Sequence, residues 1–381
     1  MTSSEDLLPS DAVCMNHIGD EHLRRHLGAI MTASRCSFCA TRSLCGEPVA
    51  VDLHHLMRRV LGAVREKYER TSTPERGIDT VRAVQDICQG AVEPYVTRAL
   101  LQWTEPALWQ LREAPCHHPP DEIDASWNLF HQQVSSYRRF TLLAGPGRHG
   151  EPSPIVMLDK VSAVVNRLGL VRTLSAGQQV WRGRMRRDPT PPGYAAAEIG
   201  STPLERATAN RMSPVGVSMF YGSENVATVL AEITAHDPRP YAAVAAFELI
   251  RPVSVVDLAT VPTTPSVFDP DRRSLIGSVE FMRSFSEDLS RPVARDGHEH
   301  LAYAPTQVLT EYFRYLSPLS VDGIAFRSAH NGGVNYVLFT GPEGCVDPGG
   351  ETPRAVLRLQ PGTERVIARE EVSKGCPVTD Q

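Results

Sequence analysis

Apolar residues recur at two different spacings along the chain, and the change between them separates a helical front from a mixed back. Between residues 51 and 140, apolar side chains return every three to four positions, the spacing of one helix face. The clearest run comprises Leu53, Leu56, Met57, Val60, Leu61 and Val64. Other helices are predicted over residues 20–30, 80–90 and 92–102, and around Trp109 and Trp127. The front of the chain is therefore predicted to be largely helical.

The second half combines short apolar runs with a few helical patterns. Helical spacing of apolar residues predicts helices over residues 157–170, 225–236 and 306–316. Short runs of β-branched and aromatic residues predict strands at residues 180–182, 219–221, 242–249, 254–257, 323–326, 335–339 and 356–359. Because the strands and helices do not alternate regularly, an α+β fold is favoured over a doubly wound parallel sheet.

Shifts in composition divide the chain into five expected segments. A stretch rich in glycine, proline and charge at residues 144–154 is typical of a boundary loop. We expect a metal-binding module at residues 1–50, a helical domain at 51–150 and a connecting helix at 151–175. A mixed α+β domain is expected at residues 176–345, followed by a polar C-terminal extension at residues 346–381.

The charge balance and the hydropathy indicate which partners and which cellular location to expect. The chain has 39 Lys and Arg against 44 Asp and Glu, a formal charge of −5, so nucleic acid is not the expected partner. No apolar run approaches the roughly 18 residues that span a bilayer. Residues 1–10 are polar and lack the apolar core of a signal peptide. A cytoplasmic location is expected, where eight cysteines indicate metal ligands or buried thiols.

The first candidate chemistry is a metal site near the N-terminus. Cys14 and His17 form a C-x2-H pair, and Cys36 and Cys39 form a C-x2-C pair. Two-residue spacers let paired side chains hold one ion, and three thiolates with one imidazole suit tetrahedral Zn2+. With all four positions filled by protein, the site is expected to be structural. The alternatives are buried thiols beside an exposed histidine, or Cys45 in place of one ligand.

A second group of candidate residues lies between Trp181 and Glu232. Arg182 and Arg211 are cations near predicted strands, Tyr221 lies in a strand, and Glu232 lies beside the apolar stripe of the helix at 225–236. Singly, they would be surface cations, a half-buried ring and a boundary glutamate. Together they can hold an anionic, aromatic, sugar-linked ligand. No G-x-G-x-x-G motif follows a strand and no phosphate loop occurs, so a Rossmann or P-loop site has no support.

The order of these motifs resembles the RES-domain family across residues 178–341. The segments that carry the resemblance are WRGR, RMSPVGVSMFYGSENVATVLAEI, YAPTQVLTEYF and GIAFRSAHNGGVNYVLF. The front of the chain resembles the zinc-containing, HEPN-associated region of long RES proteins. That region usually has two C-x2-C pairs, and here His17 takes one cysteine place. The resemblance implies an α+β fold related to ADP-ribosyltransferases, with two small sheets and a cleft.

The resemblance also implies NAD+ as substrate and a toxin-like enzyme that destroys NAD+ by phosphorolysis or hydrolysis. It matches five family positions to Arg182, Arg211, Tyr221, Glu232 and Ser328. Arg182, Glu232 and Ser328 become the catalytic candidates. Arg182, Arg211, Tyr221, Ser328 and Asn335 become the candidates for binding NAD+.

The chemistry of NAD+ agrees with these roles. Arginine forks bind the oxygens of a pyrophosphate, and a tyrosine ring can stack on nicotinamide. Loss of nicotinamide leaves an oxocarbenium-like ribose, which the carboxylate of Glu232 would stabilise in the transition state. Ser328 would donate a hydrogen bond to ribose or phosphate.

The acceptor of the ADP-ribosyl group is left open by the sequence. Water would make the enzyme a glycohydrolase, phosphate a phosphorylase, and a macromolecule an ADP-ribosyltransferase. NAD+ degradation is favoured because no segment for docking a protein substrate is evident. A non-enzymatic protein whose front region binds a partner is the remaining alternative. The sequence also leaves open whether an antitoxin or other regulatory protein binds the chain, and whether the chain forms a homo-oligomer.

Overall fold

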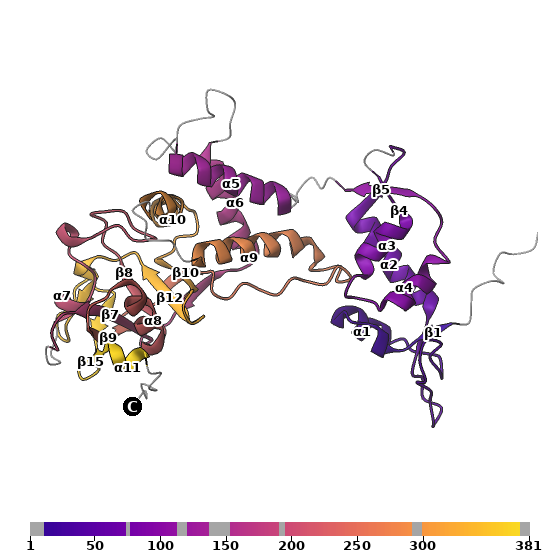
Figure 1. Ribbon diagram of the computed structural model, residues 1–381, viewed down its shortest axis with the longest axis horizontal. Helices are drawn as coiled ribbons and strands as arrows, with labels where there is room; N and C mark the ends of the chain where they lie inside the picture. Colours follow the sequence, from indigo (N-terminus) through magenta and orange to yellow (C-terminus); the bar gives the residue numbers. More distant parts are fainter. Residues whose placement is uncertain are drawn as a thin grey trace, which may run out of the picture. The chain divides into compact units, whose positions relative to one another are not determined.

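The computed structural model describes residues 11–73, 77–112, 120–136, 153–189, 195–291 and 299–373. The chain divides into two compact units, shown in Figure 1. We call Met1–Pro119 with Thr263–Gly277 the N-terminal unit, and Pro120–Pro262 with Ser278–Gln381 the C-terminal unit. The expected helical domain at residues 51–150 is therefore shared between the units. Most of the boundary loop expected at 144–154 lies outside the described residues.

The helices of the N-terminal unit begin where side chains cap them. They are α1 (Glu21–Gly28), α2 (Leu53–Lys67), α3 (Thr80–Cys88) and α4 (Pro94–Leu101). Asp20, Asp52 and Asp79 precede the first three and accept hydrogen bonds from backbone N–H groups of the first turn. α4 starts with a proline, whose missing N–H costs nothing at that position. Predicted helices at 20–30, 80–90 and 92–102 are thus confirmed.

Short strands complete this unit. β1 (Ala12–Val13) pairs with β2 (Val51–Asp52), and β3 (Tyr68–Arg70), β5 (Leu108–Leu111) and β4 (Ile78–Asp79) form a three-stranded sheet in that order. The helix predicted around Trp109 was wrong, because Trp109 lies in β5. Its buried indole donates to Thr80 Oγ1 at 3.0 Å, a bond that the strand position permits. Phe268, far away in the sequence, is 5% exposed and packs in the same core.

The C-terminal unit is built on one sheet that nearly separates into two halves. The strand order is β13-β14-β9-β7-β8-β12-β11-β10-β6, with β15 also on β9. Strand bounds are β6 (Val171–Leu174), β7 (Gln179–Arg186), β8 (Phe220–Ser223), β9 (Tyr241–Leu249), β10 (Val253–Asp257), β11 (Gly323–Arg327), β12 (Val334–Leu338), β13 (Cys345–Val346), β14 (Leu357–Leu359) and β15 (Arg365–Ala368).

The two halves meet at β7 and β8 through a single residue pair. Trp181 pairs with Ser223, whereas β7 and β9 pair along the whole of Gln179–Arg186. Beyond Trp181 the two strands diverge, and the backbone groups of β8 there are not bonded to β7. The predicted α+β fold is confirmed, and the divergence of β7 from β8 gives it two partial sheets with an opening between them.

Helices cover both faces of this sheet. They are α5 (Pro120–Ser136), α6 (Pro154–Arg167), α7 (Ala196–Ile199), α8 (Val226–His236), α9 (Ile276–Ser290), α10 (Glu299–Tyr315) and α11 (Arg369–Ser373). Buried side chains of α5, α6, α9 and α10 form one apolar cluster with β10, β11 and β12. α8 packs against β7 and β9 in a separate apolar cluster. Short 3-10 segments lie at Met15–His17, Leu204–Arg206, Arg273–Leu275 and Pro342–Gly344.

One glycine sets the distance between α8 and β7. A Cβ at Gly183 would lie 2.5 Å from Val229 Cγ1 and 2.8 Å from Ile233 Cδ1, closer than packed atoms allow. Only glycine therefore lets α8 approach the strand this closely. The consequence for the site is that Glu232, on the same helix, is held close to β7.

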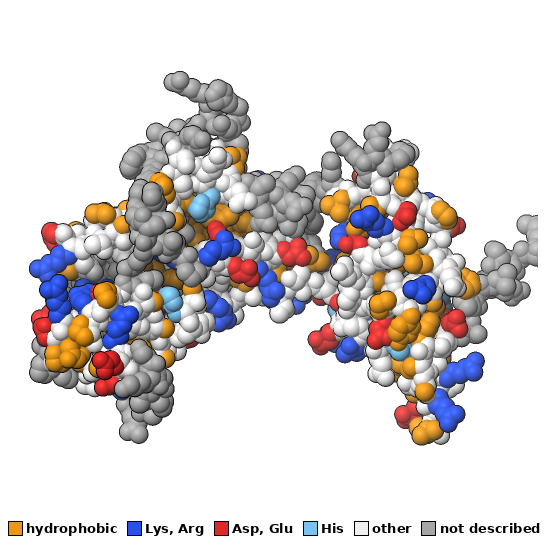
Figure 2. Space-filling model, viewed as in Figure 1, with side chains coloured by type: hydrophobic (Ala, Val, Ile, Leu, Met, Phe, Trp, Pro, Cys, Tyr) orange, Lys and Arg blue, Asp and Glu red, His pale blue; other side chains and the backbone are white. Residues whose placement is uncertain are grey.

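Residues 346–373 contain more regular structure than their polarity predicts. The extension expected at residues 346–381 supplies β14, β15 and α11, and β14 and β15 both pair with β9. The strand predicted at 356–359 is present, but β15 and α9 were not predicted. On the face shown in Figure 2, charges of both signs are interspersed on both units, in line with the balanced totals. Among the described residues, no helix is long and apolar enough to cross a membrane.

Candidate active-site cleft and candidate metal centre

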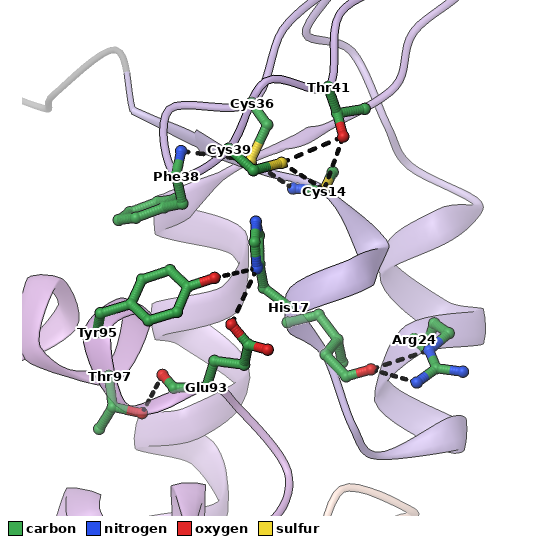
Figure 3. A network of polar contacts seen from close by, with 11 residues as sticks. Cys14, His17, Arg24, Cys36, Phe38, Cys39, Thr41, Glu93, Tyr95 and Thr97 are labelled. Atoms are coloured by element: carbon green, nitrogen blue, oxygen red, sulfur yellow. Dashed lines mark hydrogen bonds and ion pairs between the residues drawn. The ribbon is translucent and has the colours of Figure 1, made fainter.

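The four predicted metal ligands of the N-terminal unit lie together. One ligand atom from each of Cys14, His17, Cys36 and Cys39 lies within 4.8 Å of the others. The Sγ atoms of Cys14 and Cys39 are 3.6 Å apart, and Figure 3 shows the three thiols gathered above the imidazole. Cys45 is exposed and does not belong to this group. The arrangement is a closed set of three thiols and one imidazole, which suits a metal ion.

The imidazole of His17 is held in the orientation that a metal ligand needs. Its Nδ1 lies 3.2 Å from Glu93 Oε2 and 2.5 Å from the hydroxyl of Tyr95. Its Nε2 is buried and has no hydrogen-bond partner among the described residues, and an unpaired buried nitrogen is costly. In Figure 3 this nitrogen points toward the cysteines. A proton on Nδ1 directed at Glu93 leaves the Nε2 lone pair for a metal, the usual carboxylate–histidine arrangement.

Backbone amides hold one sulfur of the same group in place. The N–H groups of Cys14 and Phe38 both donate to Cys36 Sγ, at 3.3 and 3.4 Å. Cys36 is itself buried. Thiolates are the form in which cysteine binds metals.

A cleft of about 370 Å3 opens in the C-terminal unit where β7 and β8 diverge. Four residues singled out from the sequence line it: Arg182, Tyr221, Glu232 and Asn335. They come from β7, β8, α8 and β12, so the fold unites side chains that are up to 153 positions apart in the sequence. The remainder of the lining mixes polar residues, including Ser213, Ser218 and Ser223, with apolar ones such as Val229 and Phe326.

Arg182 occupies the gap between the two partial sheets. Its Nη1 donates to the carbonyl of Tyr221 on β8 at 2.5 Å, and its Nε donates to Ile199 O at 2.8 Å. The guanidinium thus takes up a β8 carbonyl that the strand pairing leaves unused. Arg182 is only 7% exposed, and burial, together with the nearby Arg184, lowers its pKa to about 9.

A second arginine, Arg184, points to the same side of β7, since alternate residues of a strand share a face. Its Nη2 donates to Gly200 O at 2.7 Å and to Thr202 Oγ1 at 3.3 Å. Burial is the main reason that its pKa is lowered. Among the described residues, neither arginine has a carboxylate within ion-pair distance; their acceptors are neutral oxygens. Two guanidinium groups held without a counterion favour an anionic ligand.

Glu232 is fixed at the cleft by a short chain of hydrogen bonds. Its Oε1 accepts from Asn335 Nδ2 at 2.7 Å, and Asn335 Oδ1 accepts from Ser223 Oγ at 2.6 Å. Its Oε2 lies 3.9 Å from Nε2 of His330. The side chain of Glu232 remains 27% exposed, so the carboxylate is both oriented and accessible from the cleft.

Tyr221 lines the cleft beside Arg182. Its hydroxyl lies 2.8 Å from Ser213 Oγ, and its ring packs against the apolar cluster of the unit. Burial raises the pKa of Tyr221 to about 12. The side chain therefore stays neutral near pH 7 and offers the cleft a ring surface.

Two residues singled out from the sequence do not line the cleft. Arg211 donates through Nη1 to Leu289 O and through Nη2 to Arg291 O at 2.6 Å, so its guanidinium binds carbonyls at the end of α9. Ser328 is 4% exposed in the turn after β11, where its Oγ accepts from the N–H of His330 at 3.2 Å. Ser328 therefore contacts the backbone of His330, and the imidazole of His330 is the group that lies near Glu232.

Sequence reasoning missed Arg184 and Arg206, which both line the cleft. A signal for Arg184 was present in Trp181-Arg182-Gly183-Arg184, because arginines two positions apart on a strand share a face. Arg206 comes from the loop before β8, and no local pattern marked it.

Comparisons with known proteins were made on the whole chain. Residues 179–356 match the family described as RES domain. The solved structure titled "Crystal structure of the M.tuberculosis MbcT-MbcA toxin-antitoxin complex" is similar with 12% identity and a TM-score of 0.30. That match covers 57% of this chain and 97% of the other, and a TM-score this low supports no argument. No curated protein matches the chain.

Proposed function

Residues 179–356 form a RES domain, and from that premise we propose that the protein consumes NAD+ by breaking the nicotinamide–ribose bond. The observation that carries the proposal is the presence, in one cleft, of an oriented carboxylate and of two arginines that have no carboxylate partner among the described residues. Arg182 and Arg184 supply the cations, and Glu232 supplies the carboxylate. A ligand that suits both must carry negative charge at one part and develop positive charge at another, as NAD+ does during loss of nicotinamide.

The arginines bind the pyrophosphate in this proposal. Guanidinium forks donate to phosphate oxygens, and such charge-assisted bonds are stronger where water is excluded. Arg182 and Arg184 are already tethered to carbonyls, so binding requires little further ordering of their side chains. Arg184 takes the phosphate-binding role that the sequence had suggested for Arg211. The ring of Tyr221 is the candidate surface for nicotinamide.

Glu232 acts on the ribose. As the C1′–N bond breaks, its electron pair moves to the nicotinamide ring, which leaves as a neutral molecule. The ribose gains oxocarbenium character, and a carboxylate fixed nearby stabilises it more than it stabilises the ground state. Asn335 and Ser223 are proposed as positioning residues, because their hydrogen bonds hold Glu232 in place. Ser328 would act indirectly, because its hydroxyl stabilises the turn that places His330 near Glu232.

The acceptor decides the name of the reaction. With water, its oxygen bonds to C1′, a proton is released, and ADP-ribose forms; with phosphate, the product is the ADP-ribosyl phosphate. The test is incubation of the full chain with NAD+, with and without phosphate, and product identification by mass spectrometry. Nicotinamide with either product supports degradation. ADP-ribose attached to a macromolecule, without bulk loss of NAD+, would make the protein a transferase instead.

An enzyme that removes NAD+ from its own cell would be toxic. We therefore propose a toxin-like role that an antitoxin or other regulatory protein restrains, and the family resemblance is its support. Expression of the wild-type chain should arrest growth and deplete cellular NAD+, and expression of the Glu232→Gln variant should do neither. Arrest by both proteins would separate toxicity from the cleft.

For the N-terminal unit we propose a structural zinc ion bound by Cys14, His17, Cys36 and Cys39. Three sulfurs and one imidazole nitrogen are the ligand set that tetrahedral zinc prefers, and the buried, unpartnered Nε2 of His17 supports a metal there. A closed set leaves no position for substrate, so the ion's role would be stability. Elemental analysis of the purified chain should find one zinc per chain, and no bound metal in a folded protein would refute the assignment.

A further inference from the structure

A second cavity, of about 320 Å3, lies wholly within the N-terminal unit. Its walls come from α1, from α2 and from residues 263–277. We call it the basic groove, because its lining includes His26, His55, Arg58, Arg59 and Arg273, and none of the described lining residues is acidic. We propose that the basic groove binds a small ligand that carries a phosphate group. The proposal does not depend on the chemistry of the cleft, which lies in the other unit.

Most of these basic residues share one face of α2. His55, Arg58, Arg59 and Gly62 are spaced three, four and seven apart, so they line up along a single side of the helix. Arg59 donates a hydrogen bond to His26 of α1 across the groove. The α2 face thus presents a row of donors to the cavity.

The positive charge of the groove is only partly offset. Arg273 pairs with Glu66 at 2.7 Å, but among the described residues Arg58 and Arg59 have no carboxylate within ion-pair distance. Burial lowers the pKa of His26, and the charges of Arg59 and His22 lower it further. His22, outside the lining, lies 3.7 Å from Asp269. Cations gathered around a concave site raise the local concentration of anions and favour phosphate.

Gly62 leaves space in the basic groove, although a glycine lowers the stability of the helix in which it lies. A glycine inside a helix costs about 1 kcal/mol relative to alanine. A Cβ at Gly62 would meet no atom within 4 Å, so close packing does not require the glycine. Any larger side chain there would extend into the cavity that Gly62 lines. The missing side chain therefore preserves space for a ligand.

The rest of the lining limits the size of that ligand. Phe268 and Val267 of residues 263–277, with Ile30 and Ala63, give the groove an apolar part beside the cations. The volume is at the lower end of small-molecule sites. With a net charge of −5, the chain does not favour a long polyanion. A phosphate group on a small, partly apolar molecule fits these features.

The test is calorimetric titration of the full chain with AMP, inorganic pyrophosphate and adenosine. AMP should bind, and adenosine should bind at least about tenfold more weakly, because the phosphate carries the recognition. Tighter binding of AMP than of pyrophosphate would indicate that the phosphate group belongs to a nucleotide-like ligand. Tighter binding of pyrophosphate would indicate an inorganic ligand. The Arg58→Gln/Arg59→Gln double variant should lose at least about tenfold in affinity, by removal of two charge-assisted contacts.

A variant at Gly62 separates binding from folding. Gly62→Leu should abolish binding while the melting temperature stays the same or rises, because leucine favours the helix. Gly62→Ala is the matched control with the smaller side chain and should keep most of the affinity. Arg184→Gln in the cleft should leave this binding event unchanged, which distinguishes it from any nucleotide bound there. Absence of AMP and pyrophosphate binding, equal binding by all variants, or binding only to an oligoribonucleotide would overturn the proposal.

Discussion

The thiol–imidazole cluster of the N-terminal unit draws its side chains from residues 14–39, whereas the cleft of the C-terminal unit is lined by residues between 182 and 336. The cluster is closed: three thiols and one imidazole face one another, and Glu93 supports the imidazole from behind. The cleft is open, and Arg182 and Arg184 donate hydrogen bonds to neutral carbonyls. The cluster can bind a single metal ion, whereas the cleft suits a larger ligand that carries negative charge.

This difference separates a stabilising site from a reacting one. A closed ligand set gives its binding energy to the fold and leaves no open position for chemistry. The cleft instead keeps two cations, which have no carboxylate partner in the described part of the chain, beside a partly exposed carboxylate; this is costly for the fold and useful for catalysis. Changes at the cluster should therefore affect stability, and changes at the cleft should affect turnover.

The largest effect is expected from removal of the metal. Loss of the ion would leave His17 Nε2 unpaired and three thiols gathered without a partner, so the N-terminal unit should lose more than about 4 kcal/mol of stability. The Cys36→Ser/Cys39→Ser variant should show early hydrogen exchange in α1 and β1, whereas β7 and β9 of the cleft should keep their protection. Cys45→Ser is the control, because Cys45 is exposed and outside the cluster. Equal loss of hydrogen-exchange protection in both units would contradict the claim that the cluster stabilises only the N-terminal unit.

A smaller effect is expected at the phosphate end of the cleft. Arg184→Gln removes a charge-assisted contact worth about 1.5–3 kcal/mol, so KM for NAD+ should rise roughly 10- to 100-fold. Stability should change little, because the lost bonds go to Gly200 O and Thr202 Oγ1 at the edge of the cleft. Arg187→Gln is the matched control, since Arg187 is exposed and does not line the cleft. An equal KM in the two variants would remove Arg184 from substrate binding.

The smallest effect is expected at the residue that positions Glu232. Asn335→Ala removes the donor to Glu232 Oε1, and His330 would still lie near the other oxygen. We expect kcat to fall about tenfold with KM nearly unchanged, because misplacement of a catalytic group affects the transition state most. Steady-state kinetics would measure both constants, and circular dichroism would report stability. A loss confined to the melting temperature would make Asn335 only structural.

The same comparison shows what the sequence could predict. The cluster of Cys14, His17, Cys36 and Cys39 was predictable because a two-residue spacer joins the members of each pair. Arg182, Tyr221 and Glu232 were predictable as a group through the motif order of the RES family. Arg184 was missed, although the two-residue period of β7 placed it beside Arg182.

The features that the sequence did not reveal have a common physical cause. The guanidinium of Arg211, which was predicted to bind phosphate, donates to carbonyls at the end of α9, a helix that the sequence did not reveal. Trp109 lies in β5 because its strand neighbours, β3 and β4, are supplied by distant residues. β15 has only four residues in a charged stretch, and its pairing with β9 decides its structure. Local pattern does not show such long-range partners.

The most direct test of the account compares nicotinamide release by the wild-type chain, Glu232→Gln and the control Glu311→Gln, with NAD+ binding measured in parallel. Glu311 is exposed on α10 and outside the cleft. Glutamine keeps the shape of Glu232 but loses its charge, so release should fall by at least about 100-fold while NAD+ binding stays within about threefold. The Glu311 variant should match the wild type. Undiminished release by Glu232→Gln would contradict the central claim, and so would a wild-type chain that binds NAD+ but releases no nicotinamide.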